Sequence, residues 1–148
     1  MDTGSIRVLL VDDDEDDYII THDLLAESTD ATFVLAWVAT YEAAVASIEC
    51  QQYDVYLVDY QLGAYNGLDL LRTARAAGCQ APFILLTGQG DHEVDVEAMQ
   101  TGAADYLLKG QIDAPLLERA IRYAIERKRT ETELQRAKEA AETASRAE

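Results

Sequence analysis

The chain alternates short, unbroken apolar runs with longer segments in which apolar residues recur at helical spacing. Five runs rich in valine, isoleucine and leucine are each bounded by turn or capping residues. They are Ile6–Val11, Phe33–Val38, Val55–Val58, Phe83–Leu86 and Tyr106–Leu108. Runs this short and continuous are typical of strands that are buried on both faces of a sheet. The pattern therefore predicts five buried strands.

The segments between these runs predict helices. Their apolar stripes lie in Tyr18–Leu25, Ala43–Ile48, Leu68–Ala74, Val94–Met99 and the segment from Leu116 onward. Thr40 and Asp113 stand where an N-cap is expected, and Gly78 and Gly102 stand where a helix is expected to end.

Strict alternation of strand and helix favours βαβ units with right-handed crossovers, and hence one parallel sheet. We predict an α/β protein with the flavodoxin-like doubly wound fold: a five-stranded parallel sheet of order 2-1-3-4-5 with helices on both faces. Ligands of such sheets bind at the carboxyl ends of the strands, near the switch point between the first and third strands. Function is therefore expected at that edge.

Polar residues directly follow four of the predicted strands at that edge. They are Asp12 and Asp13 after the first strand, Asp59 after the third, Thr87 after the fourth and Lys109 after the fifth. Each has an ordinary explanation as a turn or strand-end residue, and we expect Asp14–Asp17 to be a solvated acidic turn before a helix. Lys109 is harder to explain in this way, because it is the only lysine of an acidic body that extends to Arg127.

This set of residues is suited to phosphoryl transfer. Crowded carboxylates repel one another and need cations to stay ionised, and Mg²⁺ together with Lys109 would supply them. A carboxylate that attacks phosphorus forms an acyl phosphate, with metal and ammonium neutralising the phosphoryl oxygens. The hydroxyl of Thr87 could then donate to the new phosphoryl group.

The acidic run has two further interpretations. Asp12, Asp14 and Asp16 have the spacing of a calcium loop, but the glycine that such a loop needs at its sixth position is Asp17 here, so we reject this interpretation. An aspartate-nucleophile phosphatase of the haloacid dehalogenase type would use Asp12 and Asp14. Enzymes of that type have threonine or valine at the position of Asp16, so this function is a weaker alternative.

Several strings in this order resemble the receiver domain of bacterial two-component response regulators. They are VLLVDDD, VYLVDYQLGAYNGLDLL, FILLTG and GAADYLLKG. The resemblance covers residues 5–127, the expected receiver domain, and suggests the N-terminal receiver of a hybrid histidine kinase or a similar multidomain regulator. It implies that Asp59 accepts a phosphoryl group from a histidine kinase, a phosphotransfer protein or a small phosphodonor. It also implies that Mg²⁺ is held by Asp12, Asp13, Asp59 and the backbone carbonyl of Gln61.

The resemblance further implies a switch. Thr87 and Lys109 would contact the phosphoryl group, and Tyr106 would swing inward when the threonine moves. The surface formed by the helix after Asp91, the strand ending at Leu108 and the final helix would then change. Such a domain is not an enzyme beyond assisting its own phosphorylation and dephosphorylation.

The chain departs from the family pattern at two loop positions. Gly63 stands where a proline is common, and Lys109 is followed by Gly110 in place of the usual proline. The family's loop geometry therefore cannot be carried over in detail. Gln61 and Gln89 lie where side chains tune the lifetime of the phosphoryl group in this family.

From Leu116 to the last residue the chain has no glycine or proline and is dominated by good helix formers. A thin seam with a period near 3.5 passes through Leu117, Ala120, Ala124, Arg127, Glu131, Leu134 and Ala141. We expect an extended helix whose residues 128–148 form a coiled-coil-like linker to an output domain outside this chain. Homodimers could form through this helix or the switching face, and a non-switching dimerisation module is the main alternative function.

Charge and composition narrow the partners and the compartment. The net charge is −16, with the acidic excess before Arg127, which disfavours direct contact with nucleic acid or an anionic membrane. No apolar run approaches the roughly 20 residues of a membrane span, and the N-terminus shows no secretory signal. Cys50 and Cys79 have no ligand-like spacing and are expected to be free thiols in the cytoplasm.

Overall fold

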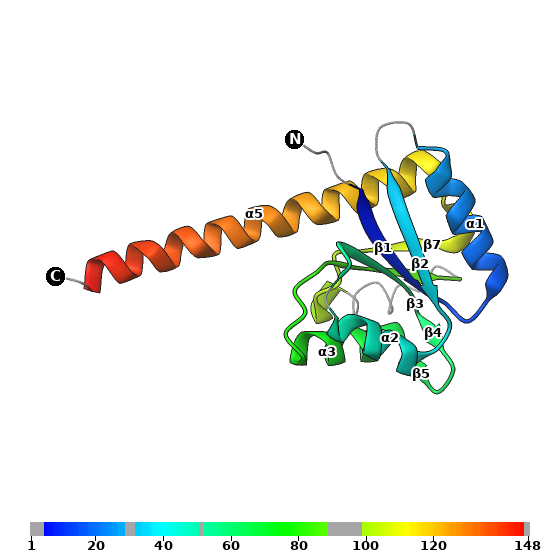
Figure 1. Ribbon diagram of the computed structural model, residues 1–148, viewed down its shortest axis with the longest axis horizontal. Coiled ribbons are helices and arrows are strands. Elements are labelled where there is room, and N and C mark those ends of the chain that lie inside the picture. The colour runs from blue at the N-terminus through cyan, green and yellow to red at the C-terminus, as the bar shows by residue number, and fades with distance from the viewer. Residues whose placement is uncertain (1–4, 29–31, 51, 89–98, 147–148) are drawn as a thin grey trace.

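The computed structural model describes residues 5–28, 32–50, 52–88 and 99–146, and it contains one five-stranded parallel sheet (Figure 1). The strands are β1 (Ile6–Val11), β2 (Phe33–Val38), β3 (Val55–Asp59), β6 (Phe83–Thr87) and β7 (Asp105–Leu108). Their order is β2-β1-β3-β6-β7, and every neighbouring pair is parallel. The predicted fold class and strand order are confirmed.

Helices cover both faces of this sheet. They are α1 (Glu15–Ala26), α2 (Tyr41–Glu49), α3 (Gly67–Ala76) and α5 (Ala114–Arg146). Side chains alternate along β1: Val8 and Leu10 pack with α1 and α5, whereas Leu9 and Val11 pack with α2 and α3. The helix predicted over Val94–Met99 lies outside the described residues except at Met99.

The two edge strands differ from the expectation of burial on both faces. All residues of β3 and β6 are buried, as predicted. In β2 no residue is fully buried and the side chain of Val34 is 50% exposed, while β7 has only one buried residue. The reason is their position at the two ends of the strand order, where each strand has a single neighbour.

The predicted helix boundaries are confirmed by capping contacts. The side chain of Thr40 accepts a hydrogen bond from the backbone N–H of Ala43, and that of Asp113 accepts one from Leu116. Gly78 and Gly102 have φ values of 94° and 110°, the left-handed conformation that suits a residue just after a helix.

The long helix α5 runs from the sheet into solvent, as Figure 1 shows. The seam residues Leu117, Ala120 and Ala124 pack in the core of the body rather than facing outward. The ammonium of Lys128 donates to the side-chain carbonyl of Gln80 at 3.2 Å, and farther along Leu134 is 70% exposed. No helix within the described residues is long and apolar enough to cross a membrane.

Candidate functional site

The sheet brings four of the predicted site residues to one edge. Asp12 follows β1, Asp59 ends β3, Thr87 ends β6, and Lys109 follows β7 at the start of a short 3₁₀ helix, η1 (Lys109–Gln111). Asp12, Asp59 and Thr87 are buried polar residues among otherwise apolar strands. Buried polar groups need partners, so their gathering at one edge marks a site rather than a structural core.

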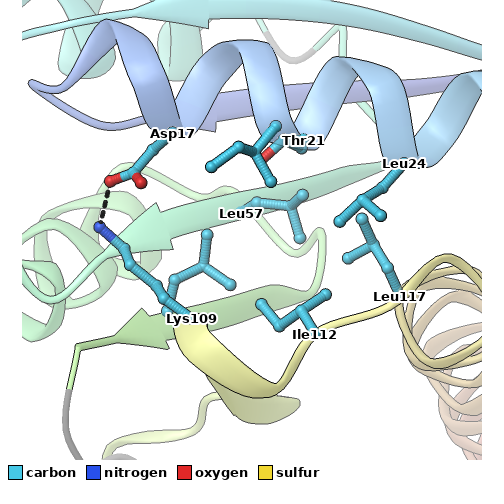
Figure 2. Close-up of a pocket in the computed structure, with 9 residues that line it drawn as sticks. Asp17, Thr21, Leu24, Leu57, Lys109, Ile112 and Leu117 are labelled. Carbon is cyan, nitrogen blue, oxygen red and sulfur yellow. Dashed lines mark hydrogen bonds and ion pairs between the residues drawn. The ribbon is translucent and has the colours of Figure 1, made fainter.

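Lys109 lies at the centre of this edge. Its Nζ is 2.6 Å from Asp17 Oδ2, 3.0 Å from Asp12 Oδ2 and 3.2 Å from Asp59 Oδ2. Figure 2 shows the contact with Asp17, which comes from the first turn of α1. The expectation that Asp17 belongs to a solvated turn is therefore wrong. The periodicity of α1 directs Asp17 toward β7, whereas Asp14 and Asp16 are exposed.

The carboxyl group of Asp12 is fully buried. Its Oδ1 accepts a hydrogen bond from the backbone N–H of Asp14 at 2.9 Å, while Oδ2 has no well-aligned hydrogen bond despite its ion pair with Lys109. Burial raises the pKa of Asp12 to about 7, against the opposing effects of the Asp14 hydrogen bond and the Lys109 ammonium. The indole N–H of Trp37 donates to the backbone carbonyl of Asp12 at 2.7 Å and so fixes the end of β1.

The pKa values of Asp59 and Lys109 are also raised, but for different reasons. Burial raises the pKa of Asp59, opposed by Lys109 and by the Gln61 backbone N–H, which donates to Asp59 Oδ1 at 3.2 Å. Burial alone would lower the pKa of Lys109, but its hydrogen bond to Asp17 and its ion pairs with Asp12 and Asp59 outweigh that effect and raise it. Lys109 is therefore a permanent cation, and the pocket holds more negative than positive charge when its carboxylates are ionised.

This excess of carboxylate suits a second cation. One oxygen each from Asp12, Asp17 and Asp59 lies within 4.8 Å of the others, but this is the space that the Lys109 ammonium already occupies. A metal ion that used Asp12 and Asp59 as ligands would have to approach them from another side. The exposed Asp13 is close enough for its charge to raise the pKa of Asp59. Carboxylate and carbonyl oxygens are hard ligands that suit Mg²⁺.

The predicted switch residues lie on neighbouring strands. Thr87 is paired with Leu108 across β6 and β7, and Tyr106 is paired with Leu85. Tyr106 is half-buried and packs on the core between the sheet and helices α2 and α3. Its inward movement stays a prediction, and Gln89 lies outside the described residues.

The family model described as "Response regulator receiver domain" matches residues 8–122. The chain belongs to this family. Over 116 residues the receiver is 34% identical to the response regulator RppA of Synechocystis sp., covering 77% of this chain and 48% of RppA. The chain thus spans about half the length of the curated relatives it matches.

Solved receiver domains have the same fold. The signal receiver domain of a putative Luxo repressor protein from Vibrio parahaemolyticus is 25% identical with a TM-score of 0.77, covering 88% of this chain and 98% of its own. The receiver domain of the sensor histidine kinase PA1611 from Pseudomonas aeruginosa PAO1 is 27% identical with a TM-score of 0.72, covering 83% and 99%. The structure of PA1611 is described with a magnesium ion coordinated in its active-site cleft.

The loop after Asp59 forms a small hairpin in this receiver, which the sequence did not predict. Strands β4 (Gln61–Leu62) and β5 (Tyr65–Asn66) pair antiparallel, and Gly63 takes a left-handed φ of 63° in the turn. The ring of Tyr65 stacks on that of Tyr41 at 4.0 Å, and the Tyr41 hydroxyl is 2.6 Å from Thr73 Oγ1. These contacts hold the loop that carries Gln61 against α2 and α3. The loop has Gly63 at the position where a proline is common in the family.

Gly67 allows α3 to press against the end of β3. A Cβ at this position would lie 2.8 Å from Leu85 Cδ2 and 3.0 Å from the backbone carbonyl of Asp59. Asn66 caps the helix in a reciprocal pair with Asp69. Close backbone approach at Gly67 therefore fixes the position of Asp59. The Lys109–Gly110 bond is trans, like every other peptide bond of the described residues.

Proposed function

We propose that this receiver is a phosphoacceptor switch in which Asp59 is the phosphorylated residue. The observation that carries this proposal is the Lys109 ammonium, 3.0 Å from buried Asp12 and 3.2 Å from Asp59 at the carboxyl ends of the strands. An ammonium held there can neutralise a phosphoryl group on Asp59. Mg²⁺ would be held by Asp12, Asp13, Asp59 and the Gln61 carbonyl, an assignment supported by the oxygen donors present and by the magnesium-bound PA1611 receiver.

The proposed reaction is a transfer of phosphorus to a carboxylate oxygen. Asp59 attacks the phosphorus of a phosphohistidine on a histidine kinase or phosphotransfer protein, or of acetyl phosphate. A new O–P bond forms as the bond to the donor breaks, and the donor leaves with that electron pair. Mg²⁺ would supply positive charge that offsets the negative charge of the phosphoryl oxygens. Lys109 offsets it from the other side, and the Thr87 hydroxyl donates to the phosphoryl group. Hydrolysis returns the carboxylate and inorganic phosphate.

Residues 5–127 form the switch and residues 128–148 the connector in this proposal. Movement of Thr87 toward the phosphoryl group opens space that Tyr106 fills, and this changes the surface around β7 and α5. The connector carries the change to an output domain of a longer chain. The free thiols of Cys50 and Cys79 and a kinase phosphodonor fit a protein of the cytoplasm.

Incubation with acetyl phosphate and Mg²⁺, followed by intact mass spectrometry, tests the proposal directly. Wild-type protein should gain the mass of one phosphoryl group, and removal of Mg²⁺ by EDTA should prevent the gain. Asp59→Asn should show none, whereas Asp54→Asn, a matched change near the opposite end of β3, should behave like the wild type. A gain of equal size in Asp59→Asn would refute the assignment.

The exposed end of α5 supports association through the tail as a second function. Leu134 is 70% exposed beyond the body, as expected for a residue that a partner helix would cover. Light scattering of the chain with and without residues 128–148 tests this, because a tail-mediated dimer should become monomeric on truncation. The phosphatase alternative loses support, because the Asp14 side chain caps α1 by accepting from the Asp16 N–H.

A further inference from the structure

We propose that Asp17 is a positioning residue of the phosphorylation site, which holds the Lys109 ammonium in the resting state and competes for it with the phosphoryl group. This inference rests on the proposed function of Asp59 as the phosphoacceptor. Asp17 comes from α1, whereas the other carboxylates close to Lys109 come from the sheet. It therefore adds a helix to a site otherwise built on strand ends.

The contact between Asp17 and Lys109 is the shortest in the pocket. Nζ lies 2.6 Å from Asp17 Oδ2 with hydrogen-bond geometry, against 3.0 and 3.2 Å for the ion pairs with Asp12 and Asp59. The two side chains are 25% and 24% exposed, so the pair is largely shielded from water. The partners are 92 positions apart in sequence, so the contact depends on the packed fold and not on a local turn.

The surroundings of the pair strengthen it. Asp17 and Lys109 lie at one end of a small cavity of about 40 Å³ between α1, the sheet and the start of α5 (Figure 2). The rest of its lining is mostly apolar, including Leu24, Leu57 and Ile112. Attraction between opposite charges is stronger beside such a wall than in water. Among the described residues, the carboxylates within 4.0 Å of Nζ are those of Asp12, Asp17 and Asp59.

This arrangement opposes phosphorylation in two ways. When Asp59 forms its O–P bond and the donor's bond to phosphorus breaks, the new group brings additional negative charge that the ammonium must neutralise. Lys109 must then share or give up its bond to Asp17. The Asp17 carboxylate also repels the incoming phosphoryl group. Removal of its charge removes both effects, and we expect phosphorylation about three- to tenfold faster, after allowance for partial exposure.

The rate experiment compares variants of one helix. The rate of mass gain with acetyl phosphate and saturating Mg²⁺ is measured for the wild type, Asp17→Asn, Asp17→Glu and Asp16→Asn. Asp16 is the exposed neighbour, so its substitution makes the same change in net charge away from Lys109. We expect Asp17→Asn to be faster, Asp17→Glu to return toward the wild-type rate, and Asp16→Asn to match it. If the wild type gains the phosphoryl group and Asp17→Asn gains it at the same rate, the inference about Asp17 is refuted, while the proposed function of Asp59 is not.

A second measurement needs no phosphorylation. Urea unfolding of Asp17→Asn, Lys109→Met and the double variant should show non-additive changes in the unfolding midpoint, because each single substitution removes the same contact between Asp17 and Lys109. The cycle of Asp16→Asn with Lys109→Met should be additive. If the midpoint changes of Asp17→Asn and Lys109→Met are additive, the contact between Asp17 and Lys109 in the unphosphorylated protein is refuted. Failure of the wild type to gain mass overturns the proposed function, and with it the competition.

Discussion

Replacement of Asp12 by asparagine should stabilise this protein in the absence of Mg²⁺, although it removes an ion pair. The carboxyl group is fully buried, and its Oδ2 lacks a well-aligned hydrogen bond. The pKa of Asp12 rises from 3.8 to about 7, which corresponds to at most about 4 kcal/mol of unfolding free energy lost when the group ionises. Asparagine has a similar shape and carries no charge, so it avoids this cost.

The sign of the effect depends on pH. Because the pKa of Asp12 is higher in the folded than in the unfolded state, the folded protein binds more protons between pH 3.8 and about 7. The stability that this group contributes is present below pH 3.8 and is lost as the pH rises to about 7. Asp12→Asn does not lose this stability. Its unfolding free energy relative to the wild type should therefore increase from pH 3.8 to about 7 and stay constant above pH 7.

Urea unfolding followed by circular dichroism in EDTA, at pH values across and above this window, measures the difference. Asp13→Asn is the control, since it changes the net charge equally at an exposed neighbouring position. Addition of Mg²⁺ should reduce the difference in unfolding free energy between Asp12→Asn and the wild type, because a ligand that binds only the folded wild type stabilises it. The reasoning is wrong if Asp12→Asn is no more stable than Asp13→Asn above pH 7, or if its advantage is the same at low pH.

Further predictions concern the loop and the contacts around Asp59. Gly67→Ala should cost about 1–3 kcal/mol in urea unfolding, because its Cβ overlaps Leu85 and the Asp59 carbonyl, whereas Gly110→Ala, with open space around it, should cost little. Binding of Mg²⁺ should change the fluorescence of Trp37, the only tryptophan, which donates to the Asp12 carbonyl. In that titration, Tyr65→Ala should weaken Mg²⁺ binding several-fold through loss of its ring stack, and an unchanged affinity would contradict the role of the hairpin.

The elements of the fold were predictable because their signals are local. Each predicted strand lies within one residue of the observed bounds, since an apolar run ends where the chain leaves the core. Burial was not predictable at the same precision. The sequences of the edge strand β2 and the central strand β3 are both apolar, and only the strand order shows that Val34 has no neighbour on one side.

The site was predictable where it follows from topology and not where it follows from helix packing. Parallel strands place their carboxyl ends together, so Asp12, Asp59 and Lys109 could be grouped from the sequence. Asp17 could not, because an acidic residue in the first turn of a helix is already explained by the helix dipole. The hairpin at Gln61 was missed because two-residue strands have no periodicity. The glycine at position 63 was its only signal.

Lys109 joins three parts of the molecule. It contacts α1 through Asp17, contacts the sheet through Asp12 and Asp59, and begins η1, which ends only a few residues before α5 starts at Ala114. A phosphoryl group that draws the ammonium toward Asp59 should therefore shift the backbone of η1, which Lys109 begins. It should also weaken the contact that Lys109 makes with Asp17 in the first turn of α1. The same step thus acts on the two helices that pack together on one face of the sheet. We expect beryllofluoride and Mg²⁺ to change amide hydrogen exchange at both places, and a change confined to the loop after Asp59 would contradict this coupling.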